Sequence, residues 1–191
     1  MFGRYSAHIV TSIYLVVTLT YIRQGLPYYF SASMVVMGNE AGRQTWATRA
    51  DGWVRDTRVL DLAFAPFTAA ILNAAGLDSA HRVLDIGCGM GTLLEEVTAA
   101  GVEAVGFDIA PVMVDAARAR VPAATAIQAD AQTADLPAMA GGVRFDTVLS
   151  RFGVMFFDDP VAAFANIRAA TGPGARLVLA SWRADERDMF R

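Results

Sequence analysis

Residues 83–92 of the chain read Val-Leu-Asp-Ile-Gly-Cys-Gly-Met-Gly-Thr, a short apolar run that leads through an acid into three closely spaced glycines. Residues 83–86 are typical of a buried strand, and the apolar residues at positions 93–97 recur at helical spacing. The glycines are therefore predicted to lie on a strand-to-helix turn. Such a turn directs free backbone N–H groups and a helix N-terminus toward a ligand at the carboxyl end of the strand.

The spacing of these glycines distinguishes between two kinds of nucleotide-binding turn. A dinucleotide-binding fingerprint, G-x-G-x-x-G, would need a glycine at position 92, but that residue is Thr92. The observed order is G-x-G-x-G, and Asp85 stands two residues before the first glycine. This order disfavours a nicotinamide-dependent oxidoreductase, which is the alternative enzyme class. A tight turn that binds nothing is the structural alternative.

Length, charge and cysteine content restrict the classes of protein to consider. The 191 residues suffice for one domain with a sizeable core, and the net charge of −3 gives no sign of a nucleic-acid partner. The single cysteine, Cys88, excludes an internal disulfide and a zinc-ligand cluster, so no metal site is predicted. Because Cys88 lies between two glycines, where a small residue is required, it is interpreted as a packing residue and not as a nucleophile.

The first 37 residues differ in composition from the rest of the chain. No Asp or Glu precedes Glu40, and residues 5–22 contain no charged Asp, Glu, Lys or Arg side chain. Three interpretations of residues 1–37 are open: an extension upstream of a true start at Met34 or Met37, a membrane anchor, or a secretory signal.

Residues 38–78 are predicted to form an N-terminal helical cap. Trp46 and Trp53 lie seven residues apart, which is about two helical turns and places both indoles on one helix face. This aromatic stripe is interpreted as core-facing, with a lid over a substrate pocket as the functional alternative. Pro66 is a suitable first-turn residue for a second helix of the cap.

Strand and helix signals alternate beyond the glycine turn. A second buried strand is predicted over residues 104–108 and ends in Asp108, after which Pro111 opens a helix. A third, shorter strand, residues 126–130, ends in Asp130. A carboxylate at the tip of the second strand matches the vicinal hydroxyls of a ribose, and one at the tip of the third can accept from an exocyclic amine.

The remaining elements continue this alternation. A fourth strand, residues 145–149, is followed by a loop over residues 150–153, and Asp159 caps a helix that ends at the Gly-Pro-Gly of residues 172–174. Three residues of this helix are expected to face the core: Val161, Phe164 and Ile167. A fifth strand covers residues 177–182.

This pattern predicts an α/β fold in which a doubly wound parallel sheet is covered by helices on both faces. Residues 79–183 are assigned to the Rossmann-like core and residues 184–191 to a short tail.

Several stretches occur in the order found in one enzyme class: VLDIGCGMG, VGFDIAPVM, IQADAQ, and FDTVLSRFGVMFFDDP followed by a helix and GPGARLVLASW. From about Trp46 to Trp182, the chain resembles the ubiquinone/menaquinone-biosynthesis type of class I S-adenosylmethionine-dependent methyltransferase. The resemblance implies the strand order 3-2-1-4-5, S-adenosyl-L-methionine as cofactor, and in-line methyl transfer to a small-molecule acceptor. A cytoplasmic location is expected because export would remove such an enzyme from its cofactor, with membrane anchoring through residues 5–22 as the alternative.

The resemblance also implies which residues contact the cofactor. The glycine loop would lie under the methionine portion and the ribose, Asp85 would order the amino end, and Asp108 would hold the ribose hydroxyls. Ser150 and Arg151 would line the methyl-donor end mainly through backbone. Ile109 and Met113 would flank the adenine, and Asp130 with Ala131 would read its edge. The full predicted set is Asp85, Gly87, Cys88, Gly89, Gly91, Asp108, Ile109, Met113, Asp130, Ala131, Ser150 and Arg151.

No general base is predicted. The two histidines are His8, in residues 1–37, and His81, at the end of the sheet opposite the glycine turn. Family members continue after the fifth strand through a helix and an antiparallel hairpin, whereas this chain stops at Arg191, so a truncation is expected. Residues 177–182 would then form an unpaired edge that favours self-association. A non-catalytic remnant that binds the cofactor is the third functional interpretation.

Overall fold

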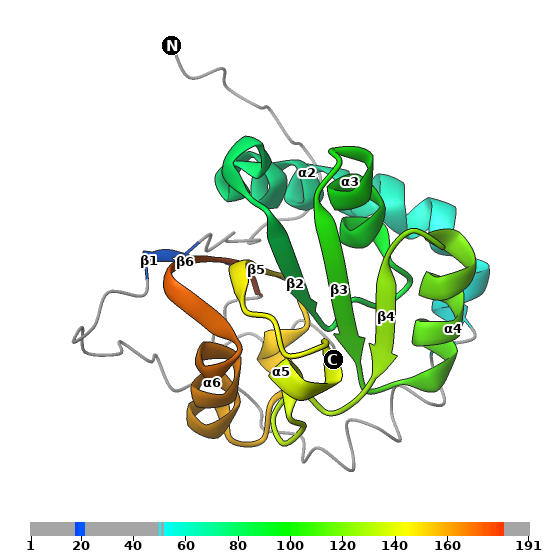
Figure 1. The fold of residues 1–191 in the computed structure, drawn as a ribbon. Coiled ribbons are helices and arrows are strands. Elements are labelled where there is room, and N and C mark those ends of the chain that lie inside the picture. Colours follow the sequence, from blue (N-terminus) through cyan, green and yellow to red (C-terminus); the bar gives the residue numbers. More distant parts are fainter. Residues whose placement is uncertain (1–17, 22–49, 51, 182–191) are drawn as a thin grey trace, which may run out of the picture.

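The computed structural model describes residues 18–21, 50 and 52–181, and the statements below concern these residues. Figure 1 shows a central sheet with helices on both faces. Its strands are β1 (Thr18–Tyr21), β2 (Arg82–Ile86), β3 (Glu103–Asp108), β4 (Thr125–Gln128), β5 (Phe145–Arg151) and β6 (Thr171–Ala180). The helices are α2 (Thr57–Ala75), α3 (Thr92–Ala99), α4 (Pro111–Arg120), α5 (Leu136–Met139) and α6 (Pro160–Ala169), with short 3-10 turns η1 (Leu77–Ser79) and η2 (Val154–Phe156).

The strand order in space is β1-β6-β5-β2-β3-β4, and β2 to β6 run parallel to one another. When these five parallel strands are numbered 1 to 5 along the chain, their order across the sheet is 3-2-1-4-5, which confirms the predicted α/β topology. Leu84 in the middle of β2 pairs with Val105 on one side and Val148 on the other. The carboxyl ends of β2, β3, β4 and β5 therefore meet along one edge of the sheet.

Two apolar layers hold the helices against the sheet. On one face, Val83 of β2 packs with residues of α2, α3 and α4, among them Ile71 and Leu94. On the other face, Leu84 packs with residues of α5 and α6, among them Leu136 and Ile167. Successive residues of β2 thus enter opposite layers, and this alternation explains why the strand reads as a continuous apolar run.

The long helix α2 covers the sheet from the side of α3 and α4. Together with η1 it is long and apolar enough to cross a membrane, with a mean hydropathy of 1.5, but one helix of this kind is weak grounds for a membrane span. Its residues Ile71 and Ala75 are buried in the core, whereas Val59 and Leu62 are exposed. The helix α2 thus packs on the sheet with one face and exposes the other.

Two expectations for the helices were wrong. Pro66 does not begin a second helix but lies inside the continuous helix α2. Proline has no N–H, so Pro66 cannot donate the helix hydrogen bond to the Leu62 carbonyl. Because Pro66 is exposed, water can hydrate this carbonyl instead. Val161 of α6 is 73% exposed and does not face the core, because Ala163 and Ile167 form the inward stripe. The predicted cap of this helix is confirmed, since the Asp159 carboxylate accepts from the Ala162 N–H.

The expected unpaired edge was also wrong. β1, which belongs to the segment 1–37, pairs antiparallel with β6, with Thr18 opposite Leu179 and Tyr21 opposite Arg176. β6 begins at Thr171 and so includes the Gly-Pro-Gly sequence assigned above to the end of a helix. The rest of residues 1–37, Trp46 and Trp182 lie outside the described residues.

A third difference concerns the end of the fourth parallel strand. Ser150 and Arg151, expected in a loop, are the last two residues of β5, and Arg151 pairs with Ala180 of β6.

Gly106 of β3 provides a test of the packing. A Cβ there would lie 2.7 Å from the Cβ of Cys88 and 2.8 Å from a methyl carbon of Leu94. We expect Gly106→Ala to lower the free energy of unfolding by about 1–3 kcal/mol through overpacking. The control is Gly172→Ala, whose new Cβ would meet, among the described residues, only the Phe145 carbonyl oxygen at 3.9 Å. It should change stability by less than about 0.5 kcal/mol. Equal stability of the two variants in urea unfolding would contradict the packing described here.

Candidate functional site

The glycine loop, residues 87–91, connects β2 to α3 at the centre of the sheet. The chain leaves β2 toward β3 on one side, and β5 lies on the other side, so the loop stands where the strand order reverses. In open α/β sheets, ligands bind at such a reversal, outside the carboxyl ends of the strands. Gly87, Gly89 and Gly91 all have positive φ angles, of 69°, 52° and 83°, which side chains rarely adopt.

Asp108, at the end of β3, holds the glycine loop. One carboxylate oxygen accepts from the Gly89 N–H at 2.8 Å, and the other accepts from the Ala110 N–H at 2.9 Å. Burial raises the pKa of Asp108, and the backbone N–H groups around it oppose this rise. A Cβ built on Gly89 would meet no atom of the described residues within 4 Å, so as far as these residues go the space beside this carboxylate and loop is open.

Asp85 differs from Asp108 in the number of donors that the described residues offer to its carboxylate. Its side chain is 2% exposed, and its Oδ1 has no hydrogen-bond partner among the described residues. Burial raises the pKa of Asp85 to about 7; the charge of Arg151 lowers it, and the charge of Asp108 raises it further. A buried carboxylate without a donor is a suitable partner for a cation supplied by a ligand.

Ser150 fixes the distance between the glycine loop and the loop after β5. Its hydroxyl donates to the Ile86 carbonyl at 2.7 Å and accepts from the Gly153 and Val154 N–H groups, both at 3.2 Å. A Cβ on Gly87 would lie 2.6 Å from the Cα of Gly153, so the two loops touch through bare backbone. The fully buried side chain of Ser150 therefore shapes the site without facing a ligand.

Three other predicted residues lie on the side of α4. A Cβ on Gly91 would be 3.3 Å from Ala117, which indicates that this glycine allows close packing of α3 on α4 and does not face the open space beside Gly89. Met113 is 4% exposed and packs with Met90 and Ala110. Ile109 is partly exposed at the start of the same connection.

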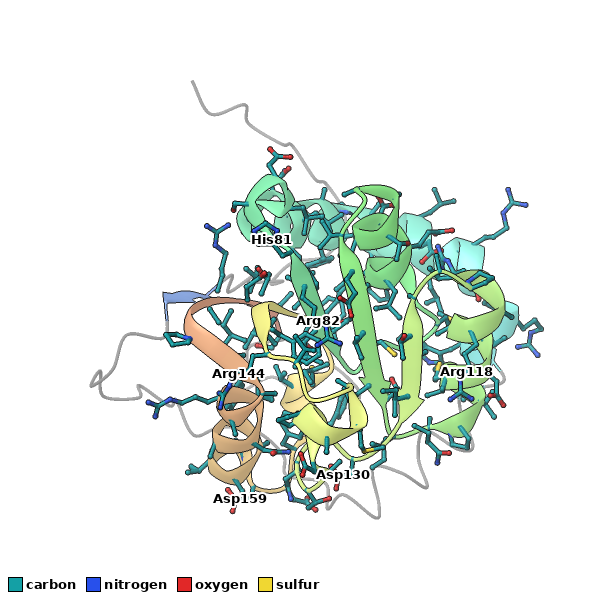
Figure 2. All side chains as sticks on the ribbon, viewed as in Figure 1. His81, Arg82, Arg118, Asp130, Arg144 and Asp159 are labelled. Carbon is teal, nitrogen blue, oxygen red and sulfur yellow. The ribbon has the colours of Figure 1, made fainter. Side chains whose placement is uncertain are left out.

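Asp130 lies beside Asp108, because the Ala129 N–H donates to the Asp108 carbonyl at 3.0 Å. The Asp130 carboxylate accepts from the Gln132 N–H at 2.9 Å and from the Thr133 hydroxyl at 3.2 Å, and these bonds shape the turn that contains the buried Ala131. Figure 2 shows Asp130 and His81 at opposite ends of the sheet, as predicted. His81 is exposed, and its backbone N–H donates to the carboxylate of Asp146.

An aromatic cluster at the end of β5 was not predicted from the sequence. The ring of Phe152 lies edge-on to Phe64 and Phe67 of α2, at 5.3 and 5.2 Å between centroids, and Trp53 stacks on Phe64 at 6.3 Å. Phe152 has a φ of 70°, which is unusual for a bulky residue and typical of functional sites. The i, i+3 spacing of Phe64 and Phe67 was the available signal, but it could not identify Phe152 as their partner.

A sequence profile of the family described as "Methyltransferase domain" matches residues 59–191, which is more than half of the chain. The chain belongs to this methyltransferase family. The matched region of the methyltransferase contains most of α2, the whole parallel sheet and the glycine loop. The family membership confirms the resemblance inferred from the motifs.

Named relatives agree with this membership. The demethylmenaquinone methyltransferase of Renibacterium salmoninarum is 32% identical over 121 residues, which cover 63% of this chain and 49% of that protein. The ubiquinone biosynthesis O-methyltransferase of Cereibacter sphaeroides (strain KD131) is 37% identical over 98 residues, 51% of this chain and 39% of that protein. The chain spans about half the length of such curated relatives, or less.

A solved structure supports the same fold. CalS10, an amino pentose methyltransferase from Micromonospora echinaspora, was solved with S-adenosylmethionine bound and is 30% identical. The match covers 86% of this methyltransferase chain and 62% of CalS10, with a TM-score of 0.52.

The environment of Cys88 leads to a prediction about its reactivity. The thiol is 6% exposed, and burial, with the nearby charges of Asp108 and Asp85, raises its pKa well above the ordinary value. Because the thiolate is the reactive form, we expect the native protein to release almost no thionitrobenzoate from Ellman's reagent at pH 8. Addition of guanidinium chloride should release one equivalent, since the chain has one cysteine. Rapid reaction of the native protein would show that Cys88 is accessible and would contradict a packing role.

Proposed function

We propose that this chain binds S-adenosyl-L-methionine at the carboxyl ends of β2, β3 and β4, and that the protein transfers the methyl group to a small-molecule acceptor. The observation that carries the proposal is the joint geometry of Gly89 and Asp108. The Gly89 N–H lies 2.8 Å from the Asp108 carboxylate, and the Cβ side of Gly89 is open. A ribose can approach bare backbone there and donate hydroxyl hydrogen bonds to the carboxylate.

Asp85 fits the amino-acid end of the same cofactor. Its buried Oδ1 has no hydrogen-bond partner among the described residues, and a ligand ammonium group would supply the missing charge and donor. Asp130 and Ala131, next to Asp108 along the sheet edge, are proposed to contact the adenine together with Ile109. Met113 supports this region from the buried cluster with Met90.

The acceptor is proposed to lie against the aromatic cluster of Trp53, Phe64, Phe67 and Phe152. This cluster joins α2 to the loop after β5, and that loop touches the glycine loop at Gly87. When bound, the cofactor supplies a methyl group on a sulfonium, whose transfer to a nucleophilic acceptor atom releases a neutral thioether. The contribution of the chain is to hold acceptor and methyl group in line and to exclude water with apolar side chains.

The proposal leaves a general base unassigned. His81, the one histidine among the described residues, lies at the far end of the sheet, and an acceptor that is already ionised or strongly nucleophilic needs no strong base. The first test is binding: S-adenosylhomocysteine, added to the full chain, should raise its melting temperature, and NAD should not. Stabilisation by NAD alone would favour the oxidoreductase. Binding without methyl transfer to any tested acceptor would favour the non-catalytic remnant.

Asp108→Ala should weaken binding of S-adenosylhomocysteine by about 1.5–3 kcal/mol, the usual cost of losing charged hydrogen bonds, or about 10- to 150-fold in Kd. The matched control is Asp115→Ala on α4, which removes an exposed carboxylate paired only with Arg118 at the surface. Isothermal titration calorimetry measures both affinities, and the melting temperature of each ligand-free variant shows whether the fold is kept. Unchanged affinity in Asp108→Ala would refute the ribose assignment.

Gly89→Val should abolish binding by placing a side chain in the space where the ligand approaches the backbone. The change also strains a residue of positive φ, by about 1–3 kcal/mol, but no atom of the part of the chain that the structure describes blocks the new Cβ. Gly101→Val is the matched control, because Gly101 has a φ of +78°, open space around its Cβ, and a position at the end of α3 away from the glycine loop. The two variants should lose similar stability in thermal melts, and only Gly89→Val should lose S-adenosylhomocysteine binding.

A further inference from the structure

The side chain of Arg151 connects three elements around the site. From the end of β5, one terminal nitrogen donates to the Thr68 hydroxyl of α2 at 2.7 Å, and the other donates to the Thr92 hydroxyl at 3.2 Å. Thr92 is the first residue of α3 and directly follows the glycine loop. The guanidinium also lies 5.8 Å from the ring centroid of Phe64, within the range of a cation–π contact.

Thr92 is the shared point of a larger polar network. Its hydroxyl donates to Asp61 of α2 at 2.8 Å and accepts from Arg120 of α4 at 3.3 Å. Arg120 in turn forms ion pairs with Asp61 at 2.9 Å and with Glu95 at 2.6 Å. Arg120 thus already has two acidic partners, whereas Arg151 contacts two hydroxyls and a ring. Among the described residues, no carboxylate is in direct contact with Arg151 to balance its positive charge.

Asp85 of β2 is opposite Leu149 of the neighbouring parallel strand β5, and Arg151 follows Leu149 by two residues. Because side chains two residues apart on a strand share a face, Asp85 and Arg151 point to the same face of the sheet. The charged groups that act on Asp85 are Arg151 from β5, which favours the ionised carboxylate, and Asp108 from β3, which disfavours it. Asp61 of α2 and Arg120 of α4 act on Arg151 itself, with opposite signs. Since Asp85 Oδ1 has no hydrogen-bond partner among the described residues, Arg151 acts on the Asp85 carboxylate through its charge and not through a hydrogen bond to that oxygen.

We propose that Arg151 is a positioning residue, which links α2 to the start of α3 and holds its positive charge where it favours the Asp85 carboxylate that receives the ammonium group of the cofactor. This inference rests on the proposed function. It assigns to the Arg151 side chain a role different from the backbone contact that the family resemblance implies. This role also connects the two parts of the site. The guanidinium that favours the Asp85 carboxylate contacts Thr68 and Phe64 of α2, the helix that carries part of the aromatic cluster.

The test compares two ligands across a range of pH. S-adenosylhomocysteine carries the ammonium group, whereas 5′-methylthioadenosine has the same adenosine part without the amino acid. Their affinities for the full chain are measured by calorimetry between pH 5.5 and 8.5 in the wild type and in Arg151→Gln. Arg168→Gln, which removes an exposed charge on α6, is the matched control. The methylthioadenosine profile reports titration of Asp108, which both ligands would contact, and so separates it from titration of Asp85.

In the wild type, affinity for S-adenosylhomocysteine should fall as the pH falls through about 7, because protonated Asp85 cannot pair with an ammonium group. In Arg151→Gln this midpoint should rise by about one pH unit, which corresponds to about fivefold weaker binding at pH 7. Binding of 5′-methylthioadenosine should keep its pH profile, and Arg168→Gln should behave as the wild type. Thr68→Val, which keeps the charge but removes one of its hydrogen bonds, should move the midpoint in the same direction by less.

The outcomes separate this inference from the proposed function. A wild type that binds neither ligand refutes the proposed function and the role of Arg151 with it. A wild type that binds both, with an unchanged midpoint in Arg151→Gln, refutes only the role of Arg151. A loss of affinity equal at every pH and for both ligands would show that Arg151 is merely structural. If Arg151→Gln does not fold, Thr68→Val decides, and an unshifted midpoint there contradicts the proposal.

Discussion

The backbones of Gly87 and Gly153 touch, and the geometry of the site depends on this contact. Any side chain at Gly87 would come within 2.6 Å of the Gly153 Cα, so the loops after β2 and β5 can meet only because both residues are glycine. The Ser150 hydroxyl keeps the two loops close together, because it donates to the Ile86 carbonyl and accepts from N–H groups of the loop after β5. The contact brings Phe152, with its φ of 70°, and the aromatic rings of α2 beside the glycine loop.

The two acids of the site are stabilised to different degrees. Asp108 accepts from backbone N–H groups on both of its oxygens, whereas Asp85 is buried with one oxygen unpartnered among the described residues. Because folding raises the pKa of Asp85 from 3.8 to about 7, the unfolded chain ionises first, and the free protein loses stability as the pH rises from about 4 to about 7. A ligand cation removes part of this cost, so the same feature that weakens the free protein favours binding. Such local conflicts with stability are expected where a site is kept ready for a ligand.

Much of the fold could be predicted from the sequence because its signals are local. Each parallel strand is an apolar run of a few residues, and the glycine turn, the acid at the end of β3 and the Pro-initiated α4 and α6 each depend on neighbours within one or two turns. The separation of Asp130 and His81 also followed from chain direction alone, since all strand tips of a parallel sheet point the same way. Pro66 and Val161 were misplaced, because solvent exposure, and not local pattern, decides what these positions tolerate.

Short-range periodicity and residue size predicted the parallel α/β core, the glycine loop and the acids at its edge, and the resemblance to the methyltransferases added the strand order. The pairing of β1 with β6, the contacts of Phe152 with Phe64 and Phe67, and the reach of Arg151 to Thr68 and Thr92 are visible only in the folded chain. These contacts join residues far apart in the chain, and nothing in the local pattern of either partner specifies the other. Their partners are chosen by how the helices dock on the sheet, which depends on the packing of the whole core.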